Sequence, residues 1–189
     1  MAVQLAVADE FGSSEIRPSV RWGAATRPRR IPRHTGVVLA PTVADVVDRL
    51  GGWIFDRTLA GCATIVFTPA PGDIRALRIL GAEVVDYADI PAVPDWTSGF
   101  GVLAVSAEMY AADPMIRKTV GARRDDGTGN TYLWGERPGA ESGPQFAVIT
   151  PHRVSLAGQA FKHHALCAAG VHADRDTDTE LLWSDSGLR

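Results

Sequence analysis

Residues 36–87 alternate short apolar segments with helical patterns, and this alternation constrains the fold more than any other feature. Residues 36–40 and 62–67 are the short apolar runs expected of strands that are covered on both faces. A helical stripe of valine and leucine lies between them and starts behind Thr42, a good N-cap. A short helix at 74–80 and a third strand at 83–87 follow. This order predicts a parallel sheet with right-handed crossovers.

The second half of the chain adds further elements to this sheet. Residues 100–105 predict a fourth buried strand, and residues 131–134 and 145–150 predict two strands of an antiparallel hairpin. Ser155 is placed to cap a helix that runs to about residue 169. We therefore expect a three-layer α/β domain, Rossmann-like or flavodoxin-like, with an antiparallel hairpin added to the parallel sheet. We expect the first strand–helix–strand unit to share one core that contains Val38, Val47, Ile54, Ile65 and Phe67.

Uneven charge divides the chain into three parts. Residues 16–44 contain six arginines and no acid, whereas residues 173–185 contain five acids and one arginine. Neither stretch has sustained apolar periodicity. We therefore expect an Arg-rich N-terminal arm at 1–34, a single α/β domain at 35–170 and an acidic C-terminal tail at 171–189. A length of 189 residues agrees with one domain.

The composition predicts a cytoplasmic protein. The two cysteines, Cys62 and Cys167, form no paired motif, which favours a reducing compartment. The apolar run 2–8 is preceded by no basic segment and is followed by Asp9 and Glu10, so we do not expect a signal peptide. No stretch reaches the roughly 20 apolar residues of a membrane span. The net charge of −3 gives no general attraction to nucleic acid or membranes.

Phosphate-binding motifs are absent from the first strand–loop–helix junction. Residues 40–43 read Ala-Pro-Thr-Val, without the glycines that let a pyrophosphate approach the backbone. The second strand ends at Thr68 rather than at an acid that would bind a ribose, which disfavours an NAD(P) dehydrogenase. No carboxylate ends the first strand, which disfavours a phospho-accepting receiver. We expect no cofactor.

Four polar residues near the carboxyl ends of the predicted strands are candidates for a ligand crevice. They are Thr42, Thr68, Asp86 and Ser106. Ser106 has the position of a hydrolase nucleophile but lacks both glycines of the nucleophile elbow, so helix capping explains it better. Asp86 is more often a turn former than a ligand.

His163 and Cys167 lie four residues apart on one predicted helix and share a face. With His152 and His172 nearby in the sequence, zinc ligation is the alternative to a simple surface arrangement. Zinc requires further ligands, and neither a C-x-x-C nor an H-x-x-x-H pair is present. We expect no metal site. A Cys167–His163 nucleophile pair is weaker still, since no third group orients it.

The Arg-rich arm is the candidate for an anionic partner, through Arg27, Arg29, Arg30 and Arg33. Arginines spaced among prolines and Trp22 fit a phosphate backbone with one base stacked on the indole. Pairing with the acidic tail is the other interpretation, and the negative net charge favours it.

Without an intact catalytic motif, our first expectation is a non-catalytic binding or regulatory protein with a small-molecule or protein partner. A homo-oligomer is left open. The alternative is a small-molecule enzyme, of transferase or hydrolase type, with its site at the carboxyl ends of the parallel strands. A nucleic-acid-associated protein that uses the arm is the second alternative. A deep pocket with convergent polar groups at the strand ends would favour the enzyme, whereas a flat or sealed end would favour the binding protein.

Overall fold

A seven-stranded sheet organises the protein, for which a computed structural model describes residues 34–92, 99–127, 129–136, 146–171 and 178–184. The strand order is β3-β2-β1-β4-β5-β7-β6. The strands are β1 (Gly36–Leu39), β2 (Thr64–Thr68), β3 (Glu83–Asp86), β4 (Val102–Ser106), β5 (Asn130–Trp134), β6 (Val148–Arg153) and β7 (Thr179–Ser184). The first five are parallel, and β7 runs antiparallel to both β5 and β6. The predicted α/β fold, with a parallel core and an antiparallel addition, is confirmed.

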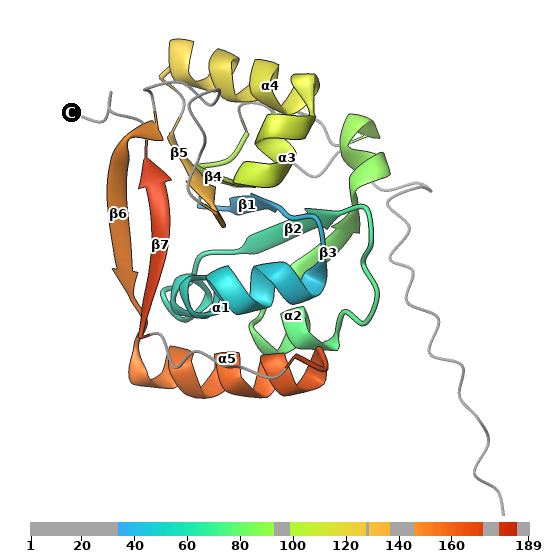
Figure 1. Ribbon diagram of the computed structural model, residues 1–189, viewed down its shortest axis with the longest axis vertical. Helices are drawn as coiled ribbons and strands as arrows, with labels where there is room; N and C mark the ends of the chain where they lie inside the picture. The colour runs from blue at the N-terminus through green and yellow to red at the C-terminus, as the bar shows by residue number, and fades with distance from the viewer. Residues whose placement is uncertain (1–33, 93–98, 128, 137–145, 172–177, 185–189) are drawn as a thin grey trace, which may run out of the picture.

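Helices cover both faces of the sheet and complete three layers (Figure 1). One face carries α1 (Val43–Leu59) and α2 (Arg75–Ile79), and α5 (Leu156–Ala168) packs against these two helices. The other face carries α3 (Ala107–Ala112) and α4 (Pro114–Asp125). A 3-10 helix, Tyr87–Ala92, follows β3. Within the described ranges, no helix is long and apolar enough to cross a bilayer.

Local sequence signals set the ends of α1 as expected. The hydroxyl of Thr42 accepts a hydrogen bond from the Asp45 amide at 3.1 Å and caps the first turn. One turn further on, Arg49 Nε lies 3.1 Å from Asp45 Oδ1, an i,i+4 pair. The chain turns out of the helix at Gly61, where φ is +81°, a conformation that favours glycine.

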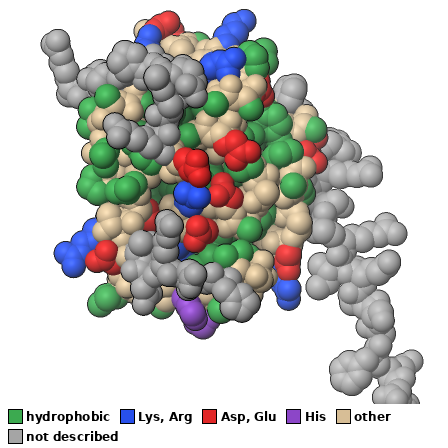
Figure 2. Space-filling view, in the orientation of Figure 1, with side chains coloured by type: hydrophobic (Ala, Val, Ile, Leu, Met, Phe, Trp, Pro, Cys, Tyr) green, Lys and Arg blue, Asp and Glu red, His purple; other side chains and the backbone are tan. Residues whose placement is uncertain are grey.

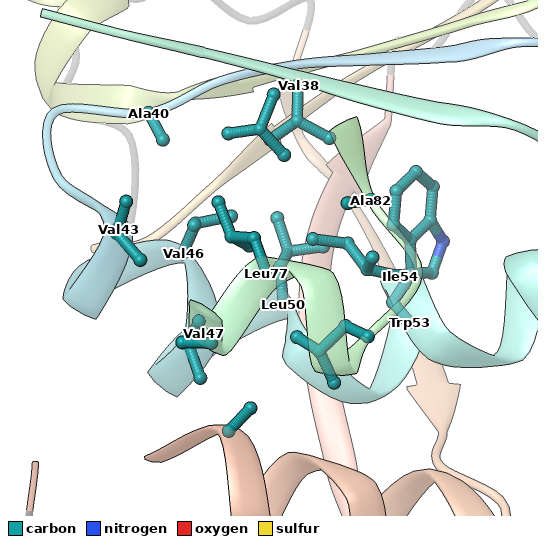
Figure 3. Close-up of a cluster of buried hydrophobic side chains, with 14 of the residues drawn as sticks. Val38, Ala40, Val43, Val46, Val47, Leu50, Trp53, Ile54, Leu77 and Ala82 are labelled. Carbon is teal, nitrogen blue, oxygen red and sulfur yellow. The ribbon is translucent and has the colours of Figure 1, made fainter. Parts of the chain in front are cut away.

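The hydrophobic core consists of two clusters, one on each face of the sheet, which corrects our expectation of a single cluster. Val38, Val47 and Ile54 belong to one cluster on the α1 side of the sheet (Figure 3). Ile65 and Phe67 belong instead to the cluster on the opposite face, beneath α3 and α4. Successive side chains of a strand point to opposite faces, so a strand buried on both sides feeds both clusters.

The predicted acidic tail contains an internal strand, so its assignment outside the folded body is wrong for Thr179–Ser184. These residues form β7, which is hydrogen-bonded to β5 on one side and to β6 on the other. Leu182 and Trp183 are buried in the two clusters. For the same reason the predicted pairing of 131–134 with 145–150 is wrong, since β7 lies between β5 and β6.

A buried carboxylate of β7 is hydrogen-bonded to the backbone in the middle of α1. Glu180 accepts hydrogen bonds from the amides of Gly52 at 2.9 Å and Trp53 at 2.7 Å, and from Lys162 Nζ at 2.7 Å. A Cβ on Gly52 would lie only 2.4 Å from Val154 Cγ1. The two glycines at 51–52 are therefore compatible with α1, and Gly52 lets the chain after β6 approach the helix closely.

Candidate functional site

The carboxyl ends of β1 and β4 form the switch point of the sheet. From β1 the chain moves outward through β2 to β3, and it then returns to the other side of β1 to form β4. In open α/β sheets, ligands bind in the crevice outside the carboxyl ends of the strands at such a point. A short loop and then the first turn of α1 follow β1, and the first turn of α3 follows β4 directly.

Thr42 and Thr68 lie at this edge, and the hydroxyl of each is hydrogen-bonded within the protein. Thr42 is exposed and caps α1. Thr68 is fully buried, donates to the carbonyl of Pro41 at 3.1 Å, and accepts from the amide of Ala70 at 3.3 Å. These bonds hold the loop between β1 and α1 against the end of β2.

Asp86 is exposed at the end of β3, paired in register with Thr68. Its carboxylate accepts a hydrogen bond from the amide of Ala88 at 2.9 Å. This contact is typical of a turn-forming aspartate.

Ser106 does not have the predicted role of a helix cap. It precedes α3 but makes no side-chain capping bond, so the capping explanation of its hydroxyl is wrong. The residue is only 2% exposed, and within the described part of the chain its hydroxyl has no hydrogen-bond partner.

Two carboxylates from different helices interact at the switch point. Burial raises the pKa of Asp45 above its ordinary value, although the neighbouring Arg49 lowers it. The negative charges of Glu108, in the first turn of α3, and of Asp48 raise the pKa further. We call Asp45, Asp48, Arg49 and Glu108 the switch-point cluster. Figure 2 shows acidic side chains gathered around a basic one on the viewed face.

Asp45, Glu108 and Trp134 were not among the candidate site residues expected from the sequence. A signal was available for the acids, since each lies in the first turn of a helix that follows a parallel strand. Trp134 ends β5 and pairs in register with Ser106. It is fully buried, and its indole N–H has no hydrogen-bond partner among the described residues.

Asp56, His152 and Ser155 come together without forming a catalytic triad. Asp56 Oδ2 lies 2.9 Å from His152 Nε2, and Asp56 Oδ1 accepts the Ser155 hydroxyl at 2.5 Å. The Ser155 hydroxyl also accepts from the Gly158 amide and caps α5. The aspartate thus holds both partners itself, whereas a triad requires the histidine to contact the serine. Burial alone would raise the pKa of Asp56, but these hydrogen bonds outweigh it and lower the pKa.

His163 and Cys167 are both exposed on α5, with Nε2 and Sγ 3.8 Å apart. Across the described ranges, no three His, Cys, Asp or Glu side chains converge as a metal site would require. His172 and the arm residues Arg27, Arg29, Arg30 and Arg33 lie outside the described residues.

The sequence matches no protein family and no curated protein. Its fold is similar to that of solved deacetylases. The A40926 pseudoaglycone deacetylase Dbv21 superposes with a TM-score of 0.55 at 15% identity, over 80% of this chain and 97% of that one. A triple mutant of the Orf2 deacetylase of teicoplanin biosynthesis gives 0.54 at 14% identity, over 82% and 100%. The deacetylase–teicoplanin complex gives 0.53 at 13% identity, over 79% and 97%.

These neighbours correct our first expectation of function. We expected a non-catalytic binding or regulatory protein, whereas the solved structures that share this fold are hydrolytic enzymes. The comparison therefore agrees better with the alternative of a small-molecule enzyme than with a non-catalytic protein. At these identities, the likeness itself establishes the fold.

Proposed function

We propose that the protein is a hydrolase of the deacetylase type that acts on a small molecule at the switch point. The observation that carries the proposal is Asp45, a carboxyl group with a raised pKa in the first turn of α1, close to the carboxyl end of β1. General bases work best when their pKa lies near the operating pH, so burial makes this carboxylate a stronger base than an ordinary aspartate. The fold shared with the A40926 pseudoaglycone deacetylase and the deacetylase of teicoplanin biosynthesis supports the same class of reaction.

In the proposed step, Asp45 accepts a proton from a water molecule while the water oxygen attacks the acyl carbonyl carbon. The bond between that carbon and the amine nitrogen then breaks, and the proton passes to the nitrogen. One water is consumed, and a carboxylic acid and an amine are released. Ser106 supplies a hydroxyl donor for the acyl oxygen, where negative charge develops during the attack.

The remaining polar groups position Asp45. Arg49 Nε, 3.1 Å from Oδ1, fixes the direction of the carboxylate. Thr42 holds the Asp45 backbone, and Thr68 holds the loop before it through Pro41. Asp86 lies at the edge of the proposed site, and its carboxylate accepts a hydrogen bond from the Ala88 amide in its own turn.

Acetate release from a panel of N-acetylated and O-acetylated small molecules tests the proposal. Asp45→Asn should lower kcat/KM on any substrate found by about 100-fold or more, since general bases contribute roughly that much. Asp125→Asn is the matched control, because that aspartate is exposed at the end of α4. No hydrolysis across the panel, or an Asp45→Asn variant as active as the control, would contradict the proposal.

A further inference from the structure

The outer face of α5 carries no charged side chain. The helix packs against α1 and α2, and Lys162, its one residue among the Asp, Glu, Lys and Arg types, is buried and paired with Glu180. The exposed positions of α5 hold leucine, alanine, phenylalanine, histidine and cysteine, and Leu156 is 85% exposed. The solvent face of a surface helix normally carries charge. An uncharged face with apolar side chains is typical of the core of an interface.

His163 and Cys167 lie one turn apart on this face, with the separation of two zinc ligands. His163 Nε2 and Cys167 Sγ are 3.8 Å apart. Zinc binds histidine nitrogen at about 2.0 Å and cysteine sulfur at about 2.3 Å, so two such ligands of a tetrahedral site lie about 3.6 Å apart. The ring of His163 also contacts that of His164, with centroids 6.1 Å apart, which restricts its orientation. The pair therefore needs little movement to hold one metal ion.

The electrostatics at this end of α5 favour a cation. Cys167 lies in the last turn, where the free carbonyl groups form the negative end of the helix dipole. The last turn contains no lysine or arginine, and the charge of Lys162 is balanced by Glu180. Both His163 and Cys167 are exposed, so a metal ion can reach them from solvent.

One chain supplies only half of a zinc site here. A structural zinc ion takes four ligands, and across the described residues no third His, Cys, Asp or Glu joins the pair. Our expectation of no metal site rested on these missing ligands of a single chain. A second copy of the chain, related by a two-fold axis, brings the same pair again and completes a set of two cysteines and two histidines.

We propose that two copies of the chain bind one zinc ion between their α5 helices, each through His163 Nε2 and Cys167 Sγ. Each thiol releases its proton when zinc binds, so two thiolates balance the charge of the ion. The uncharged outer faces of the two helices approach without repulsion between like charges. This inference does not depend on the proposed hydrolase function.

The size of the helix face makes the dimer dependent on the metal. The 13 residues of α5 give a helix about 20 Å long and about 10 Å wide, so one face covers about 200 Å². A stable interface buries about 800 Å² of each partner. The contact between the helices is therefore too small to hold a dimer by itself, and the zinc ligands supply the remaining affinity.

Sedimentation velocity of the full chain, purified without a histidine tag and kept reduced by a phosphine, tests the dimer. We expect a monomer in the presence of a chelator. Added zinc should give a dimer, complete at about one zinc per two chains and reversed by the chelator, with the stoichiometry measured by native mass spectrometry. Cobalt(II) in place of zinc should show the visible bands of a tetrahedral site and a thiolate charge-transfer band.

Variants assign the ligands to their residues. Cys167→Ser and His163→Ala should each abolish the zinc-dependent dimer. His164→Ala is the matched control for a histidine exposed on the same helix, and Cys62→Ser is the control for the other free thiol. Both controls should dimerise with zinc as the parent does. Circular dichroism confirms that each variant is folded.

The results that would overturn the inference are distinct from those that would contradict the hydrolase. Zinc bound at one per chain by a monomer would show that a single chain completes the site. A dimer that persists in chelator or in Cys167→Ser would show that the contact needs no metal. A reduced parent that binds no zinc would also overturn the inference. Absence of hydrolysis leaves the zinc site in place, and absence of zinc leaves the hydrolase in place.

Discussion

Lys162 and Glu180 form a buried ion pair, with their side chains 8% and 1% exposed. Two amides of α1 also donate to Glu180, so its carboxylate oxygens are well supplied with donors. Breaking such a pair on one side leaves a charge in a dry environment, which is more damaging than removing both partners. The pair joins three elements, α1, α5 and β7, at one point.

Lys162→Met should lower the free energy of unfolding by about 3–5 kcal/mol, because it leaves Glu180 buried and uncompensated. Lys162→Met combined with Glu180→Gln should recover part of that loss, since the unpaired charge is gone and the amide oxygen still accepts from one of the two amides of α1. Lys118, the only other lysine, is exposed, and Lys118→Met should stay within about 0.5 kcal/mol. Urea unfolding measures all three, and a double variant weaker than Lys162→Met would contradict the role of the pair.

Asp45 should make the protein less stable as the pH rises. Its pKa is raised in the folded state, so the folded protein holds the proton more tightly than the unfolded chain does. This stabilising effect is complete below the unfolded value of about 3.9 and is lost as the pH rises through the folded pKa. Asp45→Asn should therefore unfold at higher urea than the parent at pH 7, and the difference should shrink at pH 3. A parent more stable than Asp45→Asn at pH 7 would show that burial does not dominate.

At the scale of elements, the close contact between α1 and the chain after β6 depends on one missing side chain. Only hydrogen occupies the place where a Cβ on Gly52 would meet Val154. Asp56 strengthens the same contact further along α1, through His152 and Ser155. These bonds tie the antiparallel part of the sheet to the helix that carries Asp45.

Gly52→Ala should destabilise the protein by about 1–3 kcal/mol, because the new methyl group overlaps Val154 and the backbone must shift. Gly121→Ala is the control, since a Cβ there meets nothing within 4 Å in the middle of α4. That substitution should stabilise by about 0.5–1 kcal/mol through helix propensity. Thermal melts of both variants provide the comparison, and equal shifts would show that the contact is not tight.

Across the whole molecule, features encoded locally were predictable and features that depend on distant pairing were not. The caps Thr42 and Ser155 and the first three parallel strands follow from neighbouring residues, and the structure agrees. The strand β7 was not predicted, because its sequence lies within an acidic stretch. Its buried acid, Glu180, gains hydrogen-bond partners only when α1 and α5 pack beside it. Likewise, Asp45 and Glu108 become neighbours only when β4 returns to the side of β1.

Truncation tests the position of β7 directly. A chain that ends after Val171 lacks an internal strand, so β6 loses its neighbour among the described strands and β5 loses its antiparallel partner. It should fail to fold cooperatively, as shown by a lost thermal transition. A chain that ends after Ser184 keeps every described strand and should melt near the parent temperature. Cooperative folding of the shorter chain would contradict the topology.

The pH dependence of hydrolysis tests the central claim, that Asp45 acts as the base at the switch point. A base is active when deprotonated, so kcat/KM for an acylated substrate should rise with pH along an acid limb. Because the pKa of Asp45 is raised, that limb should lie above the ordinary aspartate value of about 3.9, and Asp45→Asn should abolish it. An acid limb that persists unchanged in Asp45→Asn, with the rate intact, would contradict the account.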